Sequence, residues 1–506
     1  MSQVTMAAEK PTTLEECLAL PLNESELIEV TEKAKDWAIM HGAAMRSKTN
    51  FSPDSLNFAP FLLTPSSFPR KEFEKAVNLQ TIINRLMHNV AHDEEFLTTT
   101  LAETIKVDEF TANLFNIYKK VLASGFGQRI SLGILRSDLM LETRCKDLLD
   151  ENGSKNEENE KPCAYCCWKQ VEINTIASGF GHLGPASKAI QSFVLSELEH
   201  ADKLKNMPDN QALAGICGGM VRAWEIYNNP KAVIMFIVED VTYNICDQRF
   251  HEFYIREKYP HIKVIRKTLT EVHDTGKLGL GKELIIGDLE VAVIYFRAGY
   301  EPDHYHSHNE WDARYLMESS TAIKCPSIHY HLAGTKKVQQ ALAQPEMLER
   351  FISDPDEIKM IGKIFTGLYS LDDNDAGHKN YEMALKEPER FVLKPQREGG
   401  GNNVYGLDIP DVLKKMSRVE RSAWILMDLI KPPISKGYMI RPGGSMPPPL
   451  VEVVSELGIF GVVIGDVDNI ICNYQAGHML RTKVATANEG GVAAGLGALD
   501  SPYLVD

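Results

Sequence analysis

Hydrophobic residues near the amino terminus recur with the spacing of helices, over residues 13–45 and 71–123. In the second stretch they follow one another at intervals of three and four, at Leu79, Ile82, Ile83, Leu86, Met87 and Val90. This spacing places the side chains on one face of a helix. We therefore predict a helical amino-terminal region that contributes this face to a hydrophobic core.

The pattern changes after residue 230, where short hydrophobic runs alternate with helical segments. Residues 232–238 and 261–266 have the β-branched composition of strands, and residues 244–259 between them have the pattern of a helix. Residues 283–296 predict a hairpin that turns at Gly287 and Asp288. Strands that alternate with helices are typical of a small α/β unit with a largely parallel sheet.

The last third of the chain predicts a further mixed part. We expect helices at residues 337–353, 379–388 and 409–420, and strands at 390–393, 423–427, 451–455 and 458–465. The expected fold class is therefore α/β, with a helical amino-terminal region and an inserted parallel-sheet unit. The predicted boundaries divide the chain into residues 1–230, 231–335 and 336–506.

The composition of the 506-residue chain is that of a soluble globular protein, with 44% hydrophobic and 24% charged residues. A net charge of −15 disfavours non-specific binding to nucleic acid, because a phosphate backbone attracts a basic surface. No apolar run approaches the roughly 20 residues that cross a bilayer, and the amino terminus lacks the pattern of a signal peptide. The nine cysteines lack the spacing of a disulfide framework. We expect a cytoplasmic protein with no nucleic-acid and no membrane partner.

A glycine-rich segment with charged flanks is the most informative motif. Residues 394–403 read KPQREGGGNN and follow a predicted strand. Three consecutive glycines allow positive φ angles and let backbone N–H groups approach phosphate oxygens with no side chain in between. Lys394 and Arg397 supply positive charge beside such a ligand, and Glu398 could hold a metal ion there. The alternative, a flexible surface turn, does not require this combination of residues.

A magnesium site is indicated by a predicted strand at residues 171–176. Alternation places Glu172 and Asn174 on one face of this strand, opposite Val171 and Ile173. A carboxylate and an amide oxygen are hard ligands that suit Mg²⁺. An ordinary amphipathic strand has the same pattern, so the prediction of a metal site depends on the additional carboxylate of Glu398.

Three other motifs carry weaker signals. Residues 276–283, GKLGLGKE, resemble a phosphate-binding loop, but Glu283 replaces the required Ser or Thr and a hairpin follows instead of a helix, which favours a surface turn. A single C-x-x-C pair beside a polar insertion favours a solvated loop over a zinc site formed by Cys145, Cys163, Cys166 and Cys167. The histidines favour solvated polar residues over metal ligands, at His304, His306, His308, His329 and His331.

The chain resembles a known family, the eukaryotic glutathione synthetases, which are ATP-grasp ligases. The segments that carry the resemblance occur in the family's order and are residues 135–138, 172–176, 244–249, 295–300, 332–337, 394–403, 455–458, 481–483 and 490–495. The resemblance implies an ATP-grasp fold in which residues 1–230 begin the catalytic core and residues 231–335 form the inserted substrate-binding unit. Residues 336–506 would hold the nucleotide-binding part, with a glycine-rich flap and an alanine-rich lid.

The activity that the resemblance implies is the ATP- and Mg²⁺-dependent joining of γ-glutamylcysteine to glycine, in a homodimer. ATP would phosphorylate the cysteinyl carboxylate, and the glycine amine would then displace phosphate, which gives glutathione, ADP and phosphate. Two loops rich in glycine and alanine agree with this chemistry, because an acyl phosphate must be shielded from water.

The same resemblance implies roles for individual residues. Mg²⁺ would be held by Glu172, Asn174 and Glu398, and the catalytic residues would be Arg481, Lys394 and Glu398. The ATP site would comprise Glu172, Lys336, Lys394, Pro395, Gln396, Arg397, Glu398, Gly399, Gly400, Gly401, Asn402, Asn403, Tyr405, Met427, Asp428, Leu429, Ile430, Glu456, Lys483 and Glu489. The two other substrates would contact Arg136, Ile176, Ala177, Ser178, Gly179, Thr242, Tyr243, Asn244, Gln248, Arg297, Ala298, Gly299, Tyr300, Arg481, Val492 and Ala493.

The chain departs from the family pattern on the dipeptide side of the site. Gly179 stands where the family usually has serine, and Thr242 and Tyr243 stand where it often has Glu-Arg. Two alternatives therefore remain: a diverged ligase with an altered substrate or low activity, and a silent paralogue that acts by binding a partner. The metal ligands and flap glycines argue against a silent protein, which gains nothing from keeping them.

Overall fold

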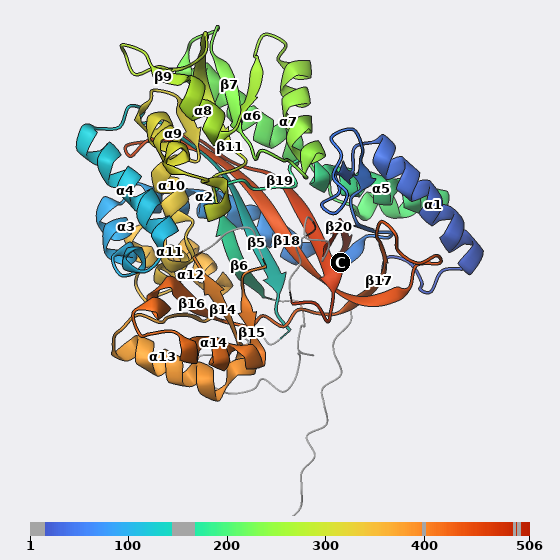
Figure 1. The fold of residues 1–506 in the computed structure, drawn as a ribbon. Coiled ribbons are helices and arrows are strands. Elements are labelled where there is room, and N and C mark those ends of the chain that lie inside the picture. Colours follow the sequence, from blue (N-terminus) through green and yellow to red (C-terminus); the bar gives the residue numbers. More distant parts are fainter. Residues whose placement is uncertain (1–15, 144–166, 397–400, 489–491, 493–496) are drawn as a thin grey trace, which may run out of the picture.

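The computed structural model describes residues 16–143, 167–396, 401–488, 492 and 497–506. The central element of this part of the chain is a seven-stranded sheet in the order β17-β3-β20-β19-β18-β5-β6 (Figure 1). Its strands are β3 (Phe61–Leu62), β5 (Ser131–Leu141), β6 (Trp168–Asn174), β17 (Ser435–Ile440), β18 (Leu450–Gly465), β19 (Ile470–Val484) and β20 (Gly497–Asp500). Neighbouring strands are antiparallel except β20 and β3.

Strand β18 is one long strand, so the prediction of two strands at residues 451–455 and 458–465 was wrong. Ser455 and Glu456 interrupt the hydrophobic run, but both are only half-buried within an unbroken ladder with β19. The interruption therefore comes from polar side chains within a continuous strand, and not from a turn: Glu456 lines a cleft, and Ser455, on the opposite face, bonds to Thr482.

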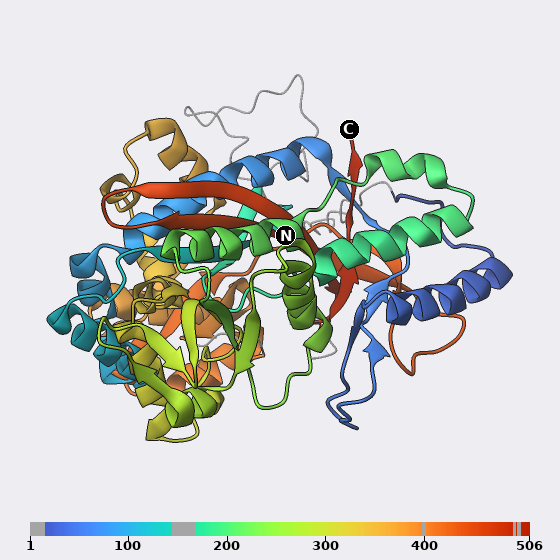
Figure 2. The same ribbon diagram turned by 90° about the horizontal axis from the view of Figure 1, so that it is seen from above.

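Helices cover both faces of the central sheet (Figure 2). Helix α2 (Arg70–Ala91) packs against one face, where its predicted hydrophobic stripe shares a core with Ile459 and Val463 of β18. Helix α6 (Ala212–Tyr227) packs against the other face, with Phe460 and Val462. The alternation of β18 thus divides its side chains between two cores, and the predicted core stripe of α2 is confirmed.

The helical stretch predicted at residues 71–123 consists of three helices, α2, α3 (Glu94–Leu101) and α4 (Glu109–Ser124). Asp93 and Asp108 separate these helices, because each carboxylate accepts a backbone N–H three residues further on, at 2.8 Å, as an N-cap. Helix α1 (Glu24–Met40) likewise begins after its N-cap, Asn23, and not at residue 13. Capping side chains therefore set boundaries that hydrophobic spacing alone does not reveal.

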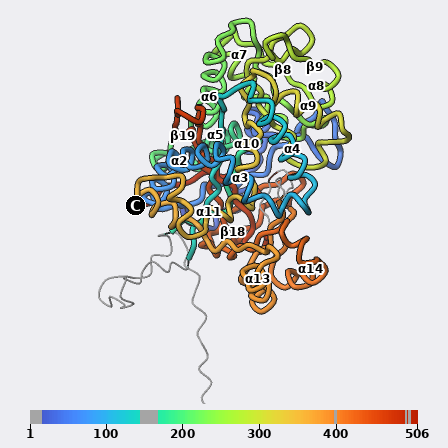
Figure 3. The backbone as a smooth tube through the Cα atoms, turned by 90° about the vertical axis from the view of Figure 1, so that its left-hand side faces the viewer, coloured from blue at the N-terminus to red at the C-terminus, as the bar shows by residue number. Residues whose placement is uncertain are grey.

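The α/β unit contains a sheet in the order β8-β7-β11-β10-β9, with β12 paired to β11 (Figure 3). Its strands are β7 (Val233–Ile237), β8 (Val264–Lys267), β9 (Gly276–Leu278), β10 (Leu284–Ile286), β11 (Leu289–Phe296) and β12 (Ile323–Cys325). Its helices include α7 (Ile245–Lys258), α8 (Leu269–Thr275) and α9 (His308–Ser319). Strands β8, β7, β11 and β12 are parallel, and the hairpin at Gly287 and Asp288 joins β10 to β11, so both predictions are confirmed. Strand β8 begins at Val264 and not at residue 261, because Ile262 is part of a turn that bonds to Tyr259.

A four-stranded antiparallel sheet forms the opposite end of the molecule (Figure 3). It contains β13 (Leu368–Ser370), β14 (Phe391–Pro395), β15 (Val404–Tyr405) and β16 (Trp424–Asp428), with α13 (Asp375–Lys386) and α14 (Ile409–Lys415) on one face. Two helices are shorter than predicted: α11 (Lys336–Leu342) ends before Pro345, and α14 ends at Lys415. Helix α12 (Pro355–Ile364) was not predicted, although Asp354 and Pro355 form a typical helix start.

The remaining α-helices and strands of the described residues are α5 (Leu183–Glu197), α10 (Ile328–Ala333), β1 (Ala44–Met45), β2 (Asn57–Phe58), β4 (Ser66–Pro69) and β21 (Pro502–Val505). The mixed α/β fold class is therefore confirmed. Among the helices of the described residues, none combines the length and apolar character needed to cross a membrane.

Candidate active site

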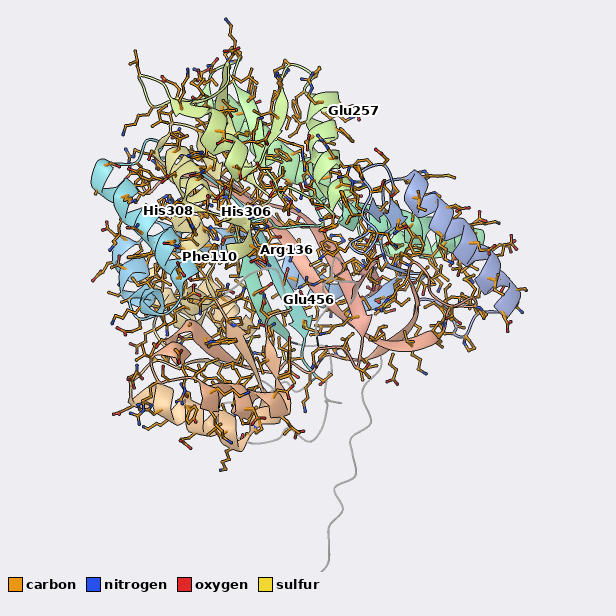
Figure 4. All side chains as sticks on the ribbon, viewed as in Figure 1. Phe110, Arg136, Glu257, His306, His308 and Glu456 are labelled. Carbon is orange, nitrogen blue, oxygen red and sulfur yellow. The ribbon has the colours of Figure 1, made fainter. Side chains whose placement is uncertain are left out.

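A cleft of about 810 Å³ lies where the central sheet, the α/β unit and the four-stranded sheet meet. Figure 4 shows two of its residues, Arg136 and Glu456, on the strands of the central sheet. The predicted site residues that line it are Arg136, Glu172, Asn174, Ile176, Ala177, Gly179, Tyr243, Asn244, Gln248, Arg297, Tyr300, Lys336, Lys394, Asn402, Asn403, Tyr405, Met427, Asp428, Leu429, Ile430, Glu456, Arg481, Lys483 and Val492. Segments far apart in the sequence therefore converge on one cleft.

The remaining predicted residues fall into two groups. Those described but absent from the lining of the cleft are Ser178, Thr242, Ala298, Gly299, Pro395, Gln396 and Gly401. Those outside the described residues are Arg397, Glu398, Gly399, Gly400, Glu489 and Ala493. The proposed metal ligand Glu398 and most of the two glycine-rich loops belong to the second group.

At one end of the cleft, cationic side chains gather around the carboxylate of Glu172. Lys336 Nζ lies 2.8 Å from Glu172 Oε2, and Lys394 Nζ donates to the backbone oxygen of Val171 at 2.9 Å. Burial alone would raise the pKa of Glu172, but the ammonium groups of Lys336 and Lys394 outweigh it and hold that pKa well below its usual range. Glu172 is therefore ionised at neutral pH.

A bulge in β6 brings a further residue of this strand to the cleft. Asp138 of β5 is opposite Glu172 but Leu139 is opposite Gln170, which leaves Val171 as an extra residue. Val171 lines the cleft together with Glu172, so the prediction that it lies on the opposite face was wrong. Ile173 is buried in the core, as predicted.

Arg481 of β19 adds a permanent positive charge to the same end. Its Nε lies 3.0 Å from Glu456 Oε1, and its Nη2 lies 3.6 Å from Asp138 Oδ2. Burial favours the neutral form, but the carboxylates of Glu456, Asp138 and Glu172 outweigh it and hold the pKa of Arg481 above its usual range. A carboxylate or phosphate that enters this end meets Arg481 together with the two lysines.

An apolar slot adjoins the cations. Its buried side chains come from facing sheets and are Met140, Val392, Met427, Ile430 and Val454. Tyr405 and Ala485 pack beside them, half-buried. The slot has the apolar character that a flat heterocyclic ring requires, and it opens directly onto the lysine side chains.

The end of the cleft beside the α/β unit is polar and anchored by the buried Asp247. Its carboxylate accepts backbone N–H groups at the beginning of α5, those of Phe180, His182 and Leu183, and lies 3.4 Å from Arg297 Nη2. Burial would raise the pKa of Asp247, but Arg297 and His251 outweigh it and lower that pKa. Asp247 thus holds Arg297 in place beside the cleft.

Glu239 presents a carboxylate to this polar end. It accepts a hydrogen bond from Gln248 Nε2 at 3.2 Å, and Arg266 donates to Gln248 Oε1 at 2.9 Å. Thr242 is buried and bonds to Arg266 and Glu239 from behind. Glu239 lines the cleft whereas Thr242 does not, so Glu239 supplies a carboxylate at this end.

The motifs with weaker signals lie away from the cleft, except for one histidine, His304. Residues 276–283 form β9 and the turn that leads to β10, as predicted. Of the clustered cysteines only Cys167 is described, and it is disulfide-bonded, which removes its thiolate from any zinc site. His304 lines the cleft, and His329 and His331 are buried, so the prediction of solvated histidines was wrong for these three. The ring of His329 packs against those of His92 and Phe126, and the ring of His331 packs against Phe110, which are residues that the sequence pattern did not place together.

Comparisons with known proteins agree with this site. A family model described as "Eukaryotic glutathione synthase, ATP binding domain" matches residues 24–504. The chain belongs to this family. It is 41% identical to the glutathione synthetase of Xenopus laevis, with 96% of this chain and 98% of that protein covered, and 40% identical to that of Homo sapiens, with the same coverage. A solved structure, a glutathione synthetase-like effector from Globodera pallida in its apo form, has 25% identity and a TM-score of 0.74, with 96% and 98% of the chains covered.

Several residues at or behind the cleft had no predicted role. Lys48, Glu239, Glu301 and His304 line it, and Asp138 contacts three of its residues from behind. Of these, only Asp138 had a signal in the sequence: it stands two residues after Arg136 on a strand, and the two therefore share a face. The others come from loops that the fold, and not a local pattern, brings to the site.

Proposed function

We propose that the protein is a glutathione synthetase, which joins γ-glutamylcysteine to glycine with the hydrolysis of ATP to ADP and phosphate. The observation that carries the proposal is the arrangement of three surfaces in the cleft. These are an apolar slot, a group of cations, and a polar end with Arg297, Gln248 and Glu239. The adenine and phosphates of ATP match the first two surfaces. A dipeptide with carboxylates and an ammonium group matches the third.

The reaction has two steps. An oxygen of the cysteinyl carboxylate attacks the γ-phosphorus of ATP, the bond to the β-phosphate oxygen breaks, and ADP leaves. The glycine amine then attacks the acyl carbon, the bond to the phosphate oxygen breaks, and the amine loses a proton to solvent. Lys336, Lys394 and Arg481 offset the negative charge of the phosphoryl group and the carboxylates throughout.

The oxygen ligands near the lysines fit Mg²⁺. Glu172 is ionised, and Asn174 donates through Nδ2 to Asp138 Oδ2 at 3.0 Å, which leaves its oxygen for another partner. Glu172, Asn174 and Glu398 would hold the ion, whose charge would neutralise the ATP phosphates. Glu398 lies outside the described residues.

The parts of the chain take the roles of an ATP-grasp ligase in this proposal. Residues 231–335 form the inserted substrate-binding unit, residues 1–230 begin the catalytic core, and residues 336–506 bind the nucleotide with a glycine-rich flap and an alanine-rich lid. The protein is a cytoplasmic homodimer, and sedimentation would give twice the mass of one chain. A diverged ligase and a silent paralogue are disfavoured, since the cations and the apolar slot are all in place.

The test of the proposal is ADP release with γ-glutamylcysteine plus glycine, and with each alone. We expect the pair to exceed either substrate alone at least tenfold, with glutathione identified by mass spectrometry. Arg481→Met is the inactive control. ADP release only with another acceptor would indicate the diverged ligase, and ATP binding without any turnover would indicate the silent paralogue.

A prediction for the dipeptide concerns Glu239. We expect Glu239→Gln to raise the KM for γ-glutamylcysteine about tenfold and to leave that for ATP within about twofold, because the carboxylate pairs with the substrate's α-ammonium group. Asp240→Asn is the matched control, since its side chain is 59% exposed and bonds to His306 instead. An equal effect of both variants would contradict the assignment.

A substitution at Gly179 is expected to strengthen the binding of the dipeptide. A Cβ there would lie 3.5 Å from Arg297 Nη2 and 3.8 Å from Asn244 Nδ2, which is ordinary contact, so a serine fits. We expect Gly179→Ser to lower the KM for the dipeptide by up to about tenfold, because one added hydroxyl contributes roughly 0.5–1.5 kcal/mol when it is paired. A KM that stays unchanged or rises would mean that the departure from serine is neutral.

A further inference from the structure

Asp138 lies behind the cleft, and the proposed reaction does not use it. It occupies β5, is fully buried, and is absent from the residues that line the cleft. Its carboxylate is nevertheless the shared partner of Arg136, Asn174 and Arg481, which all line the cleft. Asp138 does not reach the substrates, but it contacts three residues that line their binding cleft. It is therefore suited to holding these three side chains in position.

Two hydrogen bonds from Arg136 to Asp138 fix the orientation of the guanidinium group. Arg136 Nε donates to Asp138 Oδ1 at 2.7 Å and Nη2 donates to Oδ2 at 2.8 Å, which is a bidentate pair. The remaining nitrogen, Nη1, donates to the backbone oxygen of Gly179 at 3.0 Å. The plane and the tilt of the guanidinium therefore depend on Asp138.

The contact with Asn174 decides which way an amide points. Asn174 Nδ2 donates to Asp138 Oδ2 at 3.0 Å. An ionised carboxylate only accepts hydrogen bonds, so the amide nitrogen must face Asp138 and the amide oxygen must point away from it. Asn174 lines the cleft next to Glu172, and its oxygen is the atom that a hard cation would need.

The neighbouring strand leaves the space that this arrangement requires. Gly458 of β18 is the register partner of Asp138. A Cβ at residue 458 would lie 2.6 Å from Met479 Cε and 3.0 Å from both Asp138 Oδ1 and Arg136 Cδ, so that these neighbours would have to shift. Glycine at this position thus accommodates the pair.

We infer that Asp138 is a positioning residue that sets the oxygen of Asn174 for the divalent cation and the guanidinium of Arg136 for the dipeptide. The inference rests on the function proposed for the same cleft. This role is distinct from a contribution to folding stability. Asp138 sets the orientation of the side chains of Arg136 and Asn174 and does not only pack against them.

The test uses Asp138→Asn in the full chain, with two binding measurements besides activity. Mn²⁺ is titrated as a probe of the metal site in the presence of ATP and followed by electron paramagnetic resonance. γ-Glutamylcysteine is titrated by calorimetry without ATP or metal. We expect both affinities to fall about tenfold, because charge-assisted hydrogen bonds to both side chains are lost, and ATP affinity without metal to stay within about twofold.

Glu318→Gln is the matched control. Glu318 is also buried, at 2% exposure, and pairs with Arg314 at 3.0 Å, but it does not line the cleft. It should lower thermal stability and leave both affinities unchanged. If Asp138→Asn does not fold, Asp138→Glu decides the question through the same titrations, since it keeps the charge but moves the carboxylate relative to Arg136 and Asn174.

The outcomes separate the inference from the proposed function. Affinities for Mn²⁺ and dipeptide within twofold of the wild type, in Asp138→Asn or its substitute, would overturn the positioning role. Wild-type protein that releases no ADP with both substrates would overturn the proposed function, whereas a tenfold loss of Mn²⁺ affinity in the variant would still support the role of Asp138.

Discussion

Glu172→Gln is expected to reduce turnover about a hundredfold or more and to leave the fold intact. The carboxylate of Glu172 is ionised between Lys336 and Lys394, and in our proposal it is also a ligand of Mg²⁺. A neutral amide removes a metal ligand and leaves two ammonium groups without their counter-charge. A hydrogen bond to a charged group contributes about 1.5–3 kcal/mol, so the loss of two such interactions readily reaches this magnitude.

The measurement is the rate of ADP release as a function of Mg²⁺ concentration. The variant should need more Mg²⁺ for half-maximal activity, and excess Mg²⁺ should restore only part of the rate. Glu452→Gln, an exposed carboxylate on the nearby strand β18, is the control and should be unaffected. Turnover within about threefold of the wild type would remove Glu172 from the metal site.

The fold was predictable where local spacing and burial coincide. The stripe from Leu79 to Val90 was correct because one face of α2 is buried along its whole length. It was not predictable where polar residues interrupt the pattern, as in β18, where Glu456 lines the cleft and Ser455 bonds to Thr482 in the middle of a strand. Helix boundaries failed for a different reason, because single capping carboxylates such as Asp93 start new helices inside a continuous hydrophobic period.

Local patterns predicted Glu172, Asn174 and Lys394 as site residues, but the convergence of the whole site was predictable only through the family resemblance. Glu172, Lys336 and Arg481 are separated by more than a hundred residues from one another, and no local spacing relates them. The resemblance did not reveal the bulge that brings Val171 to the cleft or the carboxylate of Glu239 beside it. The bulge depends on the pairing of β6 with β5, and the carboxylate of Glu239 is held by contacts with Thr242 and Gln248.

The protein is expected to lose stability steeply as the pH falls below about 6.5. Burial lowers the pKa of several histidines, to about 4 for His88 and His251 and to about 3 for His478. The same cause lowers the pKa of His92, His182, His329 and His331. The unfolded chain binds these protons at the ordinary histidine pKa, so the stabilisation is complete above pH 6.5 and is lost as the pH falls toward the folded pKa values.

Buried acids act in the opposite direction, since burial raises the pKa of Glu72, Glu456 and Asp500. Burial raises the pKa of Asp500 to about 6, so the folded protein binds this proton before the unfolded chain does. Between pH 6 and the ordinary aspartate pKa, this uptake stabilises the folded state as the pH falls and offsets about one histidine. The histidines outnumber these acids. The ring centroids of His88 and His92 lie 4.4 Å apart and those of His92 and His329 lie 4.9 Å apart, so the charges of these rings would also repel one another.

Urea unfolding at intervals between pH 7.5 and 4.5 measures this dependence. Each buried histidine should contribute up to about a tenfold decrease in the folding equilibrium constant per pH unit below 6.5, because the unfolded state binds one more proton. His88→Gln should therefore reduce the slope by about one proton, whereas His308→Gln, at an exposed position, should leave it unchanged. A wild-type stability that is constant from pH 6.5 to 5 would show that these histidines are already protonated in the folded protein. Since His88 bonds to Tyr330 and to the backbone oxygen of Asp466, its protonation would then have to be accommodated without breaking the contact between α2 and α10.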